Sequence, residues 1–273
     1  MSRFTSTVLA SASRWFPVFV AAWVAAACGG GGDDGGSSSS GSTERPASSA
    51  QGYYIGNVTG GTTNSFRMLV LENNEFWLVY GALSGSTLSI QGFVQGSGIY
   101  SAGTFTSTAA KDYTGGGAAA GTFGGSFKTS SPSFVTSVSG TANAFGHTLA
   151  LAGDDNVLSL LYFLPASVSD ISGSWPVSLT TGETGTLSVN AAGGLTLSSP
   201  RGCTGTGALV PRPSGKNVFN LTLTFGAAPC VLPGATFTGV AYVSSVSLST
   251  QKQLTGLAHN SAQTLGLLML GAR

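Results

Sequence analysis

Residues 218–225 read Val-Phe-Asn-Leu-Thr-Leu-Thr-Phe, and apolar and polar side chains alternate along them. Phe219, Leu221, Leu223 and Phe225 form the apolar set, with Asn or Thr between them. Successive side chains of a β-strand point to opposite faces, so this period of two predicts a strand with one buried face and one wet face.

Similar segments recur on both sides, separated by turn residues. A first series comprises residues 53–58, 66–71, 76–80, 88–94, 98–106, 121–128, 134–140, 147–152 and 157–163. A polar passage at residues 165–170 separates it from a second series that starts at Ile171 and continues with residues 185–189, 194–197, 203–210, 218–225, 236–243, 253–258 and 265–270. We therefore predict an all-β protein.

The boundary divides the body into two consecutive antiparallel β-meander units, residues 52–164 and 165–273, of about eight strands each. Eight strands close a barrel that side chains can fill or that can hold one small ligand. Gly52-Tyr-Tyr and Gly173-Ser-Trp open the two units in a similar way, which is consistent with an ancient duplication. A single larger sandwich is the alternative architecture.

The amino terminus predicts export. Arg3 and Arg14 precede an uncharged apolar run of 13 residues, 15–27, which is too short to span a bilayer as a helix but suits a signal peptide. Val24-Ala-Ala-Ala-Cys28 resembles the lipobox of bacterial lipoproteins, with Ala25 where the family usually has Leu. The resemblance implies that residues 1–27 are removed and that Cys28 carries acyl chains, palmitate among them. Ordinary cleavage near Ala27 is the alternative.

The segment after Cys28 is typical of a tether. Residues 29–43 are almost wholly Gly and Ser with two Asp, a composition that cannot form a core. We predict a lipidated flexible linker over residues 28–51. By the same resemblance, Gly29 after the Cys favours the outer membrane, and three acyl chains would make anchoring to the lipid bilayer permanent.

Composition excludes some partners. Without Arg3 and Arg14, nine Lys and Arg remain of 11, against 10 Asp and Glu, so the mature chain has a formal charge of about −1. No basic run is present, and a nucleic-acid partner is not expected because phosphate binding needs clustered cations.

Cys203 and Cys230 remain as an even pair after Cys28 is assigned to lipid. In an oxidising compartment they are expected to form a disulfide, worth about 3.5 kcal/mol in the chain-entropy model. A thiol metal site is less favoured because the paired Cys or His ligands of zinc sites are missing. Two free buried thiols are the remaining alternative.

The residues that could carry chemistry are few and scattered. His147 and His259 are expected to be polar strand or turn residues, and 154–156 (Asp-Asp-Asn) to be a turn, not a cation site. Glu72 and Glu75 bracket Asn73-Asn74 and are interpreted as solvated charges beside a tight turn. Residues 115–120 resemble a dinucleotide-binding loop in letters only and are interpreted as a loop. We expect no catalytic residues, no metal and no cofactor.

Aromatic residues are the remaining binding candidates. Tyr54, Trp77 and Trp175 are the candidate ligand-binding residues, and Tyr53, Phe76 and Tyr80 belong to the same group, although filling of the core is the favoured interpretation. Gly173-Ser-Trp175 resembles the Gly-x-Trp of lipocalins, in which the Trp closes the barrel base under a basic side chain.

Taken together, the mature chain resembles uncharacterised proteobacterial lipoproteins. The matching segments include Gly52 to Gly56, Leu69 to Tyr80, Ala110-Lys-Asp-Tyr113, Gly202-Cys-Thr, residues 216–225, Pro229-Cys-Val-Leu-Pro-Gly234 and Thr238-Gly-Val-Ala241. The resemblance implies a non-enzymatic, outer-membrane-anchored structural or interaction module with an unknown protein partner. A lipocalin-like carrier of a small apolar ligand is the alternative.

Overall fold

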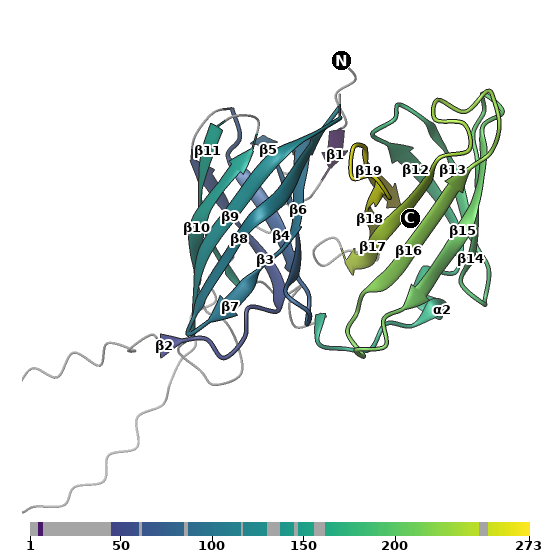
Figure 1. Cartoon of the computed structure of the whole chain (residues 1–273). Coiled ribbons are helices and arrows are strands. Elements are labelled where there is room, and N and C mark those ends of the chain that lie inside the picture. Colours follow the sequence, from purple (N-terminus) through teal and green to yellow (C-terminus); the bar gives the residue numbers. More distant parts are fainter. Residues whose placement is uncertain are drawn as a thin grey trace, which may run out of the picture.

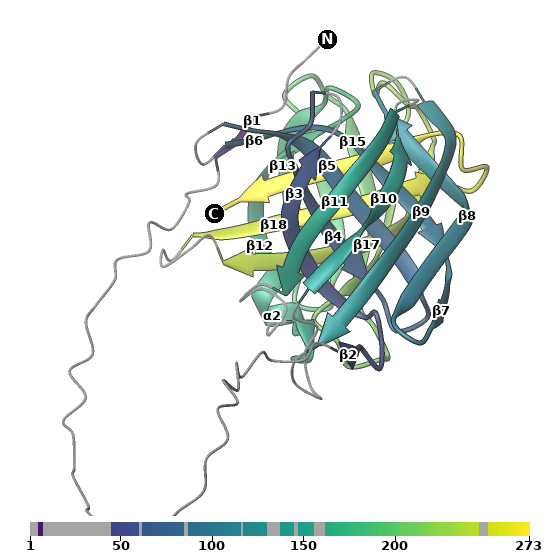
Figure 2. The same ribbon diagram turned by 90° about the vertical axis from the view of Figure 1, so that its left-hand side faces the viewer.

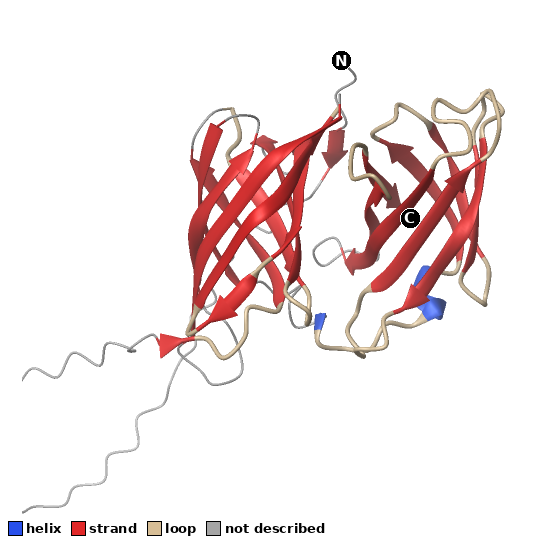
Figure 3. Ribbon diagram, in the orientation of Figure 1, coloured by secondary structure: helices blue, strands red, loops and turns tan. Residues whose placement is uncertain are grey.

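The structure is a computed structural model that describes residues 5–7, 45–59, 62–84, 87–115, 117–129, 137–144, 147–155, 162–245 and 251–273. These residues form two closed, antiparallel, eight-stranded barrels that pack against each other (Figure 1). Nearly all regular structure is strand (Figure 3). The prediction of an all-β chain with two barrel-like units is confirmed, and the single sandwich is not observed.

The first barrel is an up-and-down meander. Its strands are β3 (Gly52–Thr59), β4 (Ser65–Val70), β5 (Glu75–Ser84), β6 (Thr87–Ser97), β8 (Thr104–Thr114), β9 (Gly117–Thr129), β10 (Ser137–Ala144) and β11 (His147–Asp155). β11 pairs with β3, and the pairing of β6 with β8, with Phe93 opposite Tyr113, completes the ring. Figure 2 shows the tilted strands of this barrel from the side.

Three short strands extend the first barrel. β1 (Thr5–Thr7) pairs with the start of β6, and β7 (Ile99–Ser101) pairs with β8. β2 (Arg45–Pro46) pairs with the end of β9, and Ala47 and Ala50 are buried in the first core. The end of the predicted linker is therefore part of the folded barrel, whereas Cys28 lies outside the described residues.

The second barrel has the same up-and-down connectivity. The short helix α2 (Val168–Ile171) precedes it. Its strands are β12 (Gly173–Leu179), β13 (Thr184–Val189), β14 (Gly194–Ser198), β15 (Thr204–Pro211), β16 (Phe219–Phe225), β17 (Thr236–Ser245), β18 (Lys252–Asn260) and β19 (Gly266–Ala272). β12 pairs with both β13 and β19, which closes the barrel. Every predicted segment after Ile171 coincides with one of these strands.

The interior of each barrel is a packed core. The alternating apolar side chains of β16 all point inward, as the period of two predicted. Phe76, Phe105 and Phe123 meet at the centre of the first barrel with ring centroids 5.0 to 5.7 Å apart. Side chains therefore fill both interiors, as expected for barrels of eight strands.

Several local predictions were wrong. Residues 98–106 are two strands, because Ala102 and Gly103 turn the chain with positive φ angles of 47° and 83°. Asp154 and Asp155 lie in β11 opposite Ile55 and Tyr54 and do not form a turn. The predicted loop at residues 115–120 becomes strand from Gly117, paired with β8.

The last predicted strand of the first series, residues 157–163, lies mostly outside the described residues. Its final residue, Phe163, is in a turn instead. The turn at Asn73-Asn74 is confirmed, because the backbone N–H of Leu71 donates to the carbonyl of Glu75 and Asn74 has a φ of 61°.

Candidate functional site: the surface between the barrels

A third apolar cluster lies outside both barrels, where their walls meet. On one side it contains residues on the outer faces of β3 to β6 and β8. On the other side it contains residues on β17, β18 and β19, together with Tyr162 and Val218. The buried members are Tyr53, Leu69, Leu71, Trp77, Val79, Phe93, Tyr113, Tyr162, Val218, Val240, Tyr242, Leu257 and Leu268. Because these apolar side chains are buried between the two barrels, they hold the barrel walls together.

Stacked rings form one part of this interface. The indole of Trp77 lies parallel to the imidazole of His259, with ring centroids 5.8 Å apart, and Tyr113 lies 6.1 Å from the same imidazole. His259 is on β18, opposite Gly266 on β19. A Cβ atom added to Gly266 would lie 2.5 Å from Cβ of Tyr113, so only glycine permits this approach.

Two tyrosines form a second part. Tyr53 and Tyr242 meet edge to face with centroids 5.2 Å apart, and the Tyr242 hydroxyl donates to the Tyr53 hydroxyl over 3.4 Å. Burial raises the pKa of Tyr242 well above its ordinary value. A cavity of about 20 Å³ beside them is lined by Tyr53, Leu69, Tyr162 and Tyr242 among others. It is large enough for one water molecule but not for a lipid or a cofactor.

An ion pair also connects the barrels. The guanidinium of Arg212 donates to one carboxylate oxygen of Glu72 through Nε at 3.2 Å and Nη2 at 2.8 Å. Burial alone would raise the pKa of Glu72, but the hydrogen bonds and the charge of Arg212 outweigh it and lower that pKa. Glu72 is therefore a solvent-exposed charge, as the sequence suggested, that also pairs with Arg212 across the interface.

Glu75, in contrast, is half-buried and hydrogen-bonded, which differs from the prediction of a solvated charge. Its carboxylate accepts hydrogen bonds from Nε1 of Trp77 at 3.0 Å and from Nε2 of Gln95 at 3.4 Å. The two glutamates thus have different partners and do not form an acid/base pair. Glu75 orients Trp77 at the edge of the interface.

The sequence contains a pattern that indicates this interface, but the search for alternating strands did not detect it. Residues 76–80 (Phe-Trp-Leu-Val-Tyr) of β5 and 267–270 (Leu-Leu-Met-Leu) of β19 are apolar without alternation. Such runs are typical of strands that are buried on both faces. In β5 the even-numbered residues fill the first barrel, while Trp77 and Val79 face the second.

The three candidate ligand-binding residues are not brought together. Tyr54 is inside the first barrel, Trp175 is inside the second, and Trp77 is between them. Each is at most 1% exposed. They occupy three separate packed environments and do not outline a shared ligand site.

Tyr54 and Trp175 are nevertheless equivalent in their barrels. Each is the third residue of the opening strand, and each donates a hydrogen bond to a carbonyl four residues earlier. The Tyr54 hydroxyl donates to Ala50 over 2.8 Å, and Nε1 of Trp175 donates to Ile171 over 2.7 Å. These bonds fasten the segment that leads into each barrel and satisfy buried polar atoms.

The base of the second barrel matches the lipocalin-like expectation for Trp175. The guanidinium carbon of Arg273 lies 4.0 Å from the centroid of the indole, a cation–π contact. Nη1 of Arg273 donates to the carbonyl of Ser172 over 2.6 Å. Arg273 thus covers the Trp, and the interior above it is filled by the buried side chains of the second core.

The predicted disulfide is present at the opposite end. Cys203 and Cys230 are bonded, with Cα atoms 4.4 Å apart. Beside them, the buried carboxylate of Glu183 accepts from the Ser199 hydroxyl at 3.1 Å and from the backbone N–H of Val231 at 3.3 Å. The disulfide and this carboxylate hold the loop between β16 and β17 against the barrel.

Other ionisable groups of the described residues do not form a reactive cluster. The Tyr80 hydroxyl donates to buried Asp112 over 2.6 Å inside the first barrel, and burial together with that carboxylate raises the pKa of Tyr80. His259 is a strand residue, as expected, and His147 begins β11. Among the described residues no group of three His, Cys, Asp or Glu could hold a metal.

Comparisons with known proteins do not assign a function. No known protein family matches the sequence, and no curated protein matches it. A candidate outer membrane protein from Bacteroides fragilis is 14% identical, covering 82% of this chain and 97% of its own, with a TM-score of 0.22. A protein of unknown function from the DUF3598 family of Nostoc punctiforme is 12% identical, covering 82% and 95%, with a TM-score of 0.24. Overlays this loose support no argument about this chain.

Within the described part of the chain no helix has the length and apolarity to cross a bilayer.

Proposed function

We propose that this protein is a lipoprotein of the bacterial outer membrane, anchored through acylated Cys28, and that it serves as a non-enzymatic structural or interaction module. The observation that carries the proposal is the order of segments in the chain. An apolar run of 13 residues ends at a lipobox-like Val24-Ala-Ala-Ala-Cys28, and a Gly/Ser stretch follows it. β2 follows directly and pairs with β9.

The filled barrels support a scaffold role over catalysis. Large side chains occupy both interiors, and the ionisable groups among the described residues are dispersed in separate hydrogen bonds. A catalytic site needs at least two such groups close to one substrate. We therefore assign the contacts of the protein to its outer surface and loops, with an unidentified protein as partner.

The alternative of an apolar-ligand carrier has less support. It requires a hollow barrel, whereas Trp175 is 0% exposed and packed inside the second barrel. The shallow groove of about 620 Å³ that borders Pro176, Thr186 and Ser198 lies on the outside of that barrel and is lined mainly by Ser, Thr and Pro. Saturable quenching of Trp fluorescence by added haem or fatty acid would favour the carrier, and its absence would favour the scaffold.

Mass spectrometry of the membrane-extracted protein tests the anchor. We expect a mature chain that begins at Cys28 and carries three acyl chains, and a Cys28→Ser variant that lacks them. The same spectrum measures the mass decrease of two hydrogen atoms that accompanies formation of the disulfide. An unmodified chain with a free thiol at residue 28 would contradict the proposal and indicate a secreted or periplasmic protein instead.

A further inference from the structure

We propose that one end of the paired barrels, the end at which β2 enters the first barrel, rests on the bilayer surface. We call it the anchor end and define it by Ile99, Lys128, Phe163, Leu164 and Lys216. The proposal rests on lipidation of Cys28, which is part of the proposed function. It adds an orientation and a membrane-contact surface that lipidation alone does not specify.

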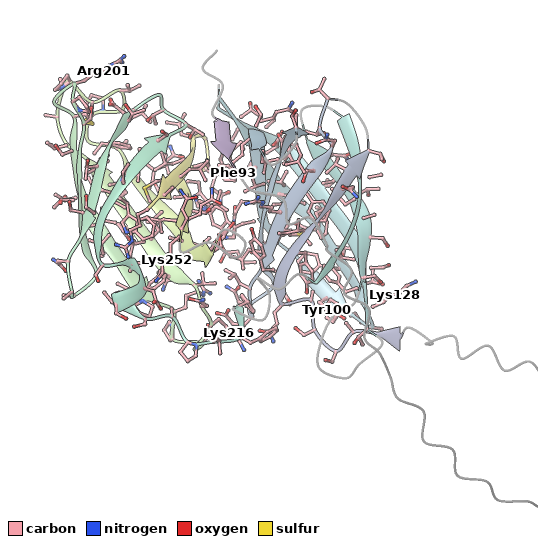
Figure 4. All side chains as sticks on the ribbon, turned by 180° about the vertical axis from the view of Figure 1, so that it is seen from behind. Phe93, Tyr100, Lys128, Arg201, Lys216 and Lys252 are labelled. Carbon is pink, nitrogen blue, oxygen red and sulfur yellow. A yellow bond between two sulfur atoms is a disulfide. The ribbon has the colours of Figure 1, made fainter. Side chains whose placement is uncertain are left out.

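The position of this end follows from the path of the chain. β2 and β7 lie at the same end of the first barrel, and the segment that joins the barrels passes that end (Figure 1). Tyr100 and Lys216 are labelled there in Figure 4, whereas Arg201 lies at the opposite end. Phe163 belongs to the same end because its ring is 4.8 Å from Nζ of Lys216.

The linker keeps this end near the bilayer. Arg45, the first residue of β2, follows Cys28 by 17 residues. A Gly/Ser-rich chain of this length has a root-mean-square span of about 23 Å. A ten-residue strand such as β17 (Thr236–Ser245) is about 33 Å long and, tilted by about 40°, spans about 25 Å along the barrel axis, so the opposite end lies about this much further from the entry of β2.

The side chains at the anchor end suit a membrane surface. Ile99 is 74% exposed, the largest exposed fraction among the large apolar residues that the structure describes, and Leu164 is 53% exposed. Lys128, near the end of β9, lies close to Tyr100 in Figure 4, and Lys216 contacts the ring of Phe163. Apolar side chains next to lysines match the interface, where acyl chains lie under anionic headgroups.

Cysteine labelling at the two ends tests the orientation. Ile99→Cys and, as the matched control at the opposite end, Leu83→Cys each replace an exposed apolar residue, and Leu83 is 38% exposed near the end of β5. Each lipidated variant is labelled with an environment-sensitive fluorophore without reductant, so that the disulfide persists. The proteins are then reconstituted into phosphatidylethanolamine/phosphatidylglycerol vesicles with brominated acyl chains.

We expect several-fold stronger quenching at position 99 than at position 83. Equal quenching at both positions, or none at either, would overturn the proposed orientation. Intact mass is measured on the same samples. A missing acyl adduct would instead disprove the anchor, which separates failure of the orientation from failure of the proposed function.

Discussion

Trp77 of the first barrel and His259 of the second stack face to face, with ring planes 13° apart. The pair lies on outward faces of strands whose other faces fill the barrel cores. The barrels are therefore coupled through the walls that a single barrel would expose to water. Each of the following predictions tests one contact of this arrangement.

We expect Trp77→Ala to uncouple the barrels. Removing a buried Trp costs about 3–5 kcal/mol, and here the loss falls on the interface and not on either core. Thermal unfolding should change from one transition to two, and the segment around residues 162–172 should become sensitive to protease. His259→Ala should act in the same direction with a smaller effect. A single unchanged transition in both variants would mean that the stack does not couple the barrels.

Gly266→Ala should disturb the same contact by crowding. The new Cβ would lie 2.5 Å from Cβ of Tyr113, and overpacking of this kind costs about 1–3 kcal/mol. Gly124→Ala is the control, because its Cβ would meet nothing within 4 Å. Urea denaturation should separate the two variants, with the control within about 0.5 kcal/mol of the wild type. Equal destabilisation would indicate a general cost of losing strand glycines.

The ion pair of Glu72 with Arg212 should make the coupling sensitive to pH. The pKa of Glu72 in the folded protein is below the ordinary value. The ion pair therefore contributes its full stabilisation above the unfolded pKa of Glu72, and this stabilisation is lost as pH falls through the folded pKa. A double-mutant cycle with Glu72→Gln and Arg212→Met should give a coupling of about 0.5–1 kcal/mol at neutral pH. That coupling should weaken as pH falls below the ordinary range of a carboxyl group and disappear once Glu72 is protonated. A coupling that persists in acid would show that charge is not its origin.

The disulfide should stabilise the second barrel. The bonded cysteines are 27 residues apart, and closing a loop of this length contributes about 3.5 kcal/mol. The double variant Cys203→Ser/Cys230→Ser should lose about this amount in guanidinium unfolding, whereas Cys28→Ser should leave barrel stability unchanged. Insensitivity of the wild type to reductant would be the contrary result.

The sequence alone was sufficient for the strands of the second barrel. Alternation in residues 218–225 reports directly which face of β16 is buried, because strand geometry ties neighbouring residues to opposite faces. The alternation pattern did not predict the turn at Ala102-Gly103, which depends on local backbone conformation. It also missed the strand at residues 117–120, a Gly/Ala run that pairs because its neighbour β8 supplies the hydrogen bonds.

What the sequence by itself determined is therefore local: the strand period, the boundary near residue 165, and the cysteine pair. Only the tertiary structure decided which aromatic residues face which neighbour. Tyr53 and Tyr54 are adjacent in the chain, yet one packs against Tyr242 of the other barrel and the other fills its own. Both are buried, so hydrophobicity cannot distinguish them. The closing of each sheet and the docking of the two walls assign the partners, and those contacts lie up to 189 residues apart in the chain.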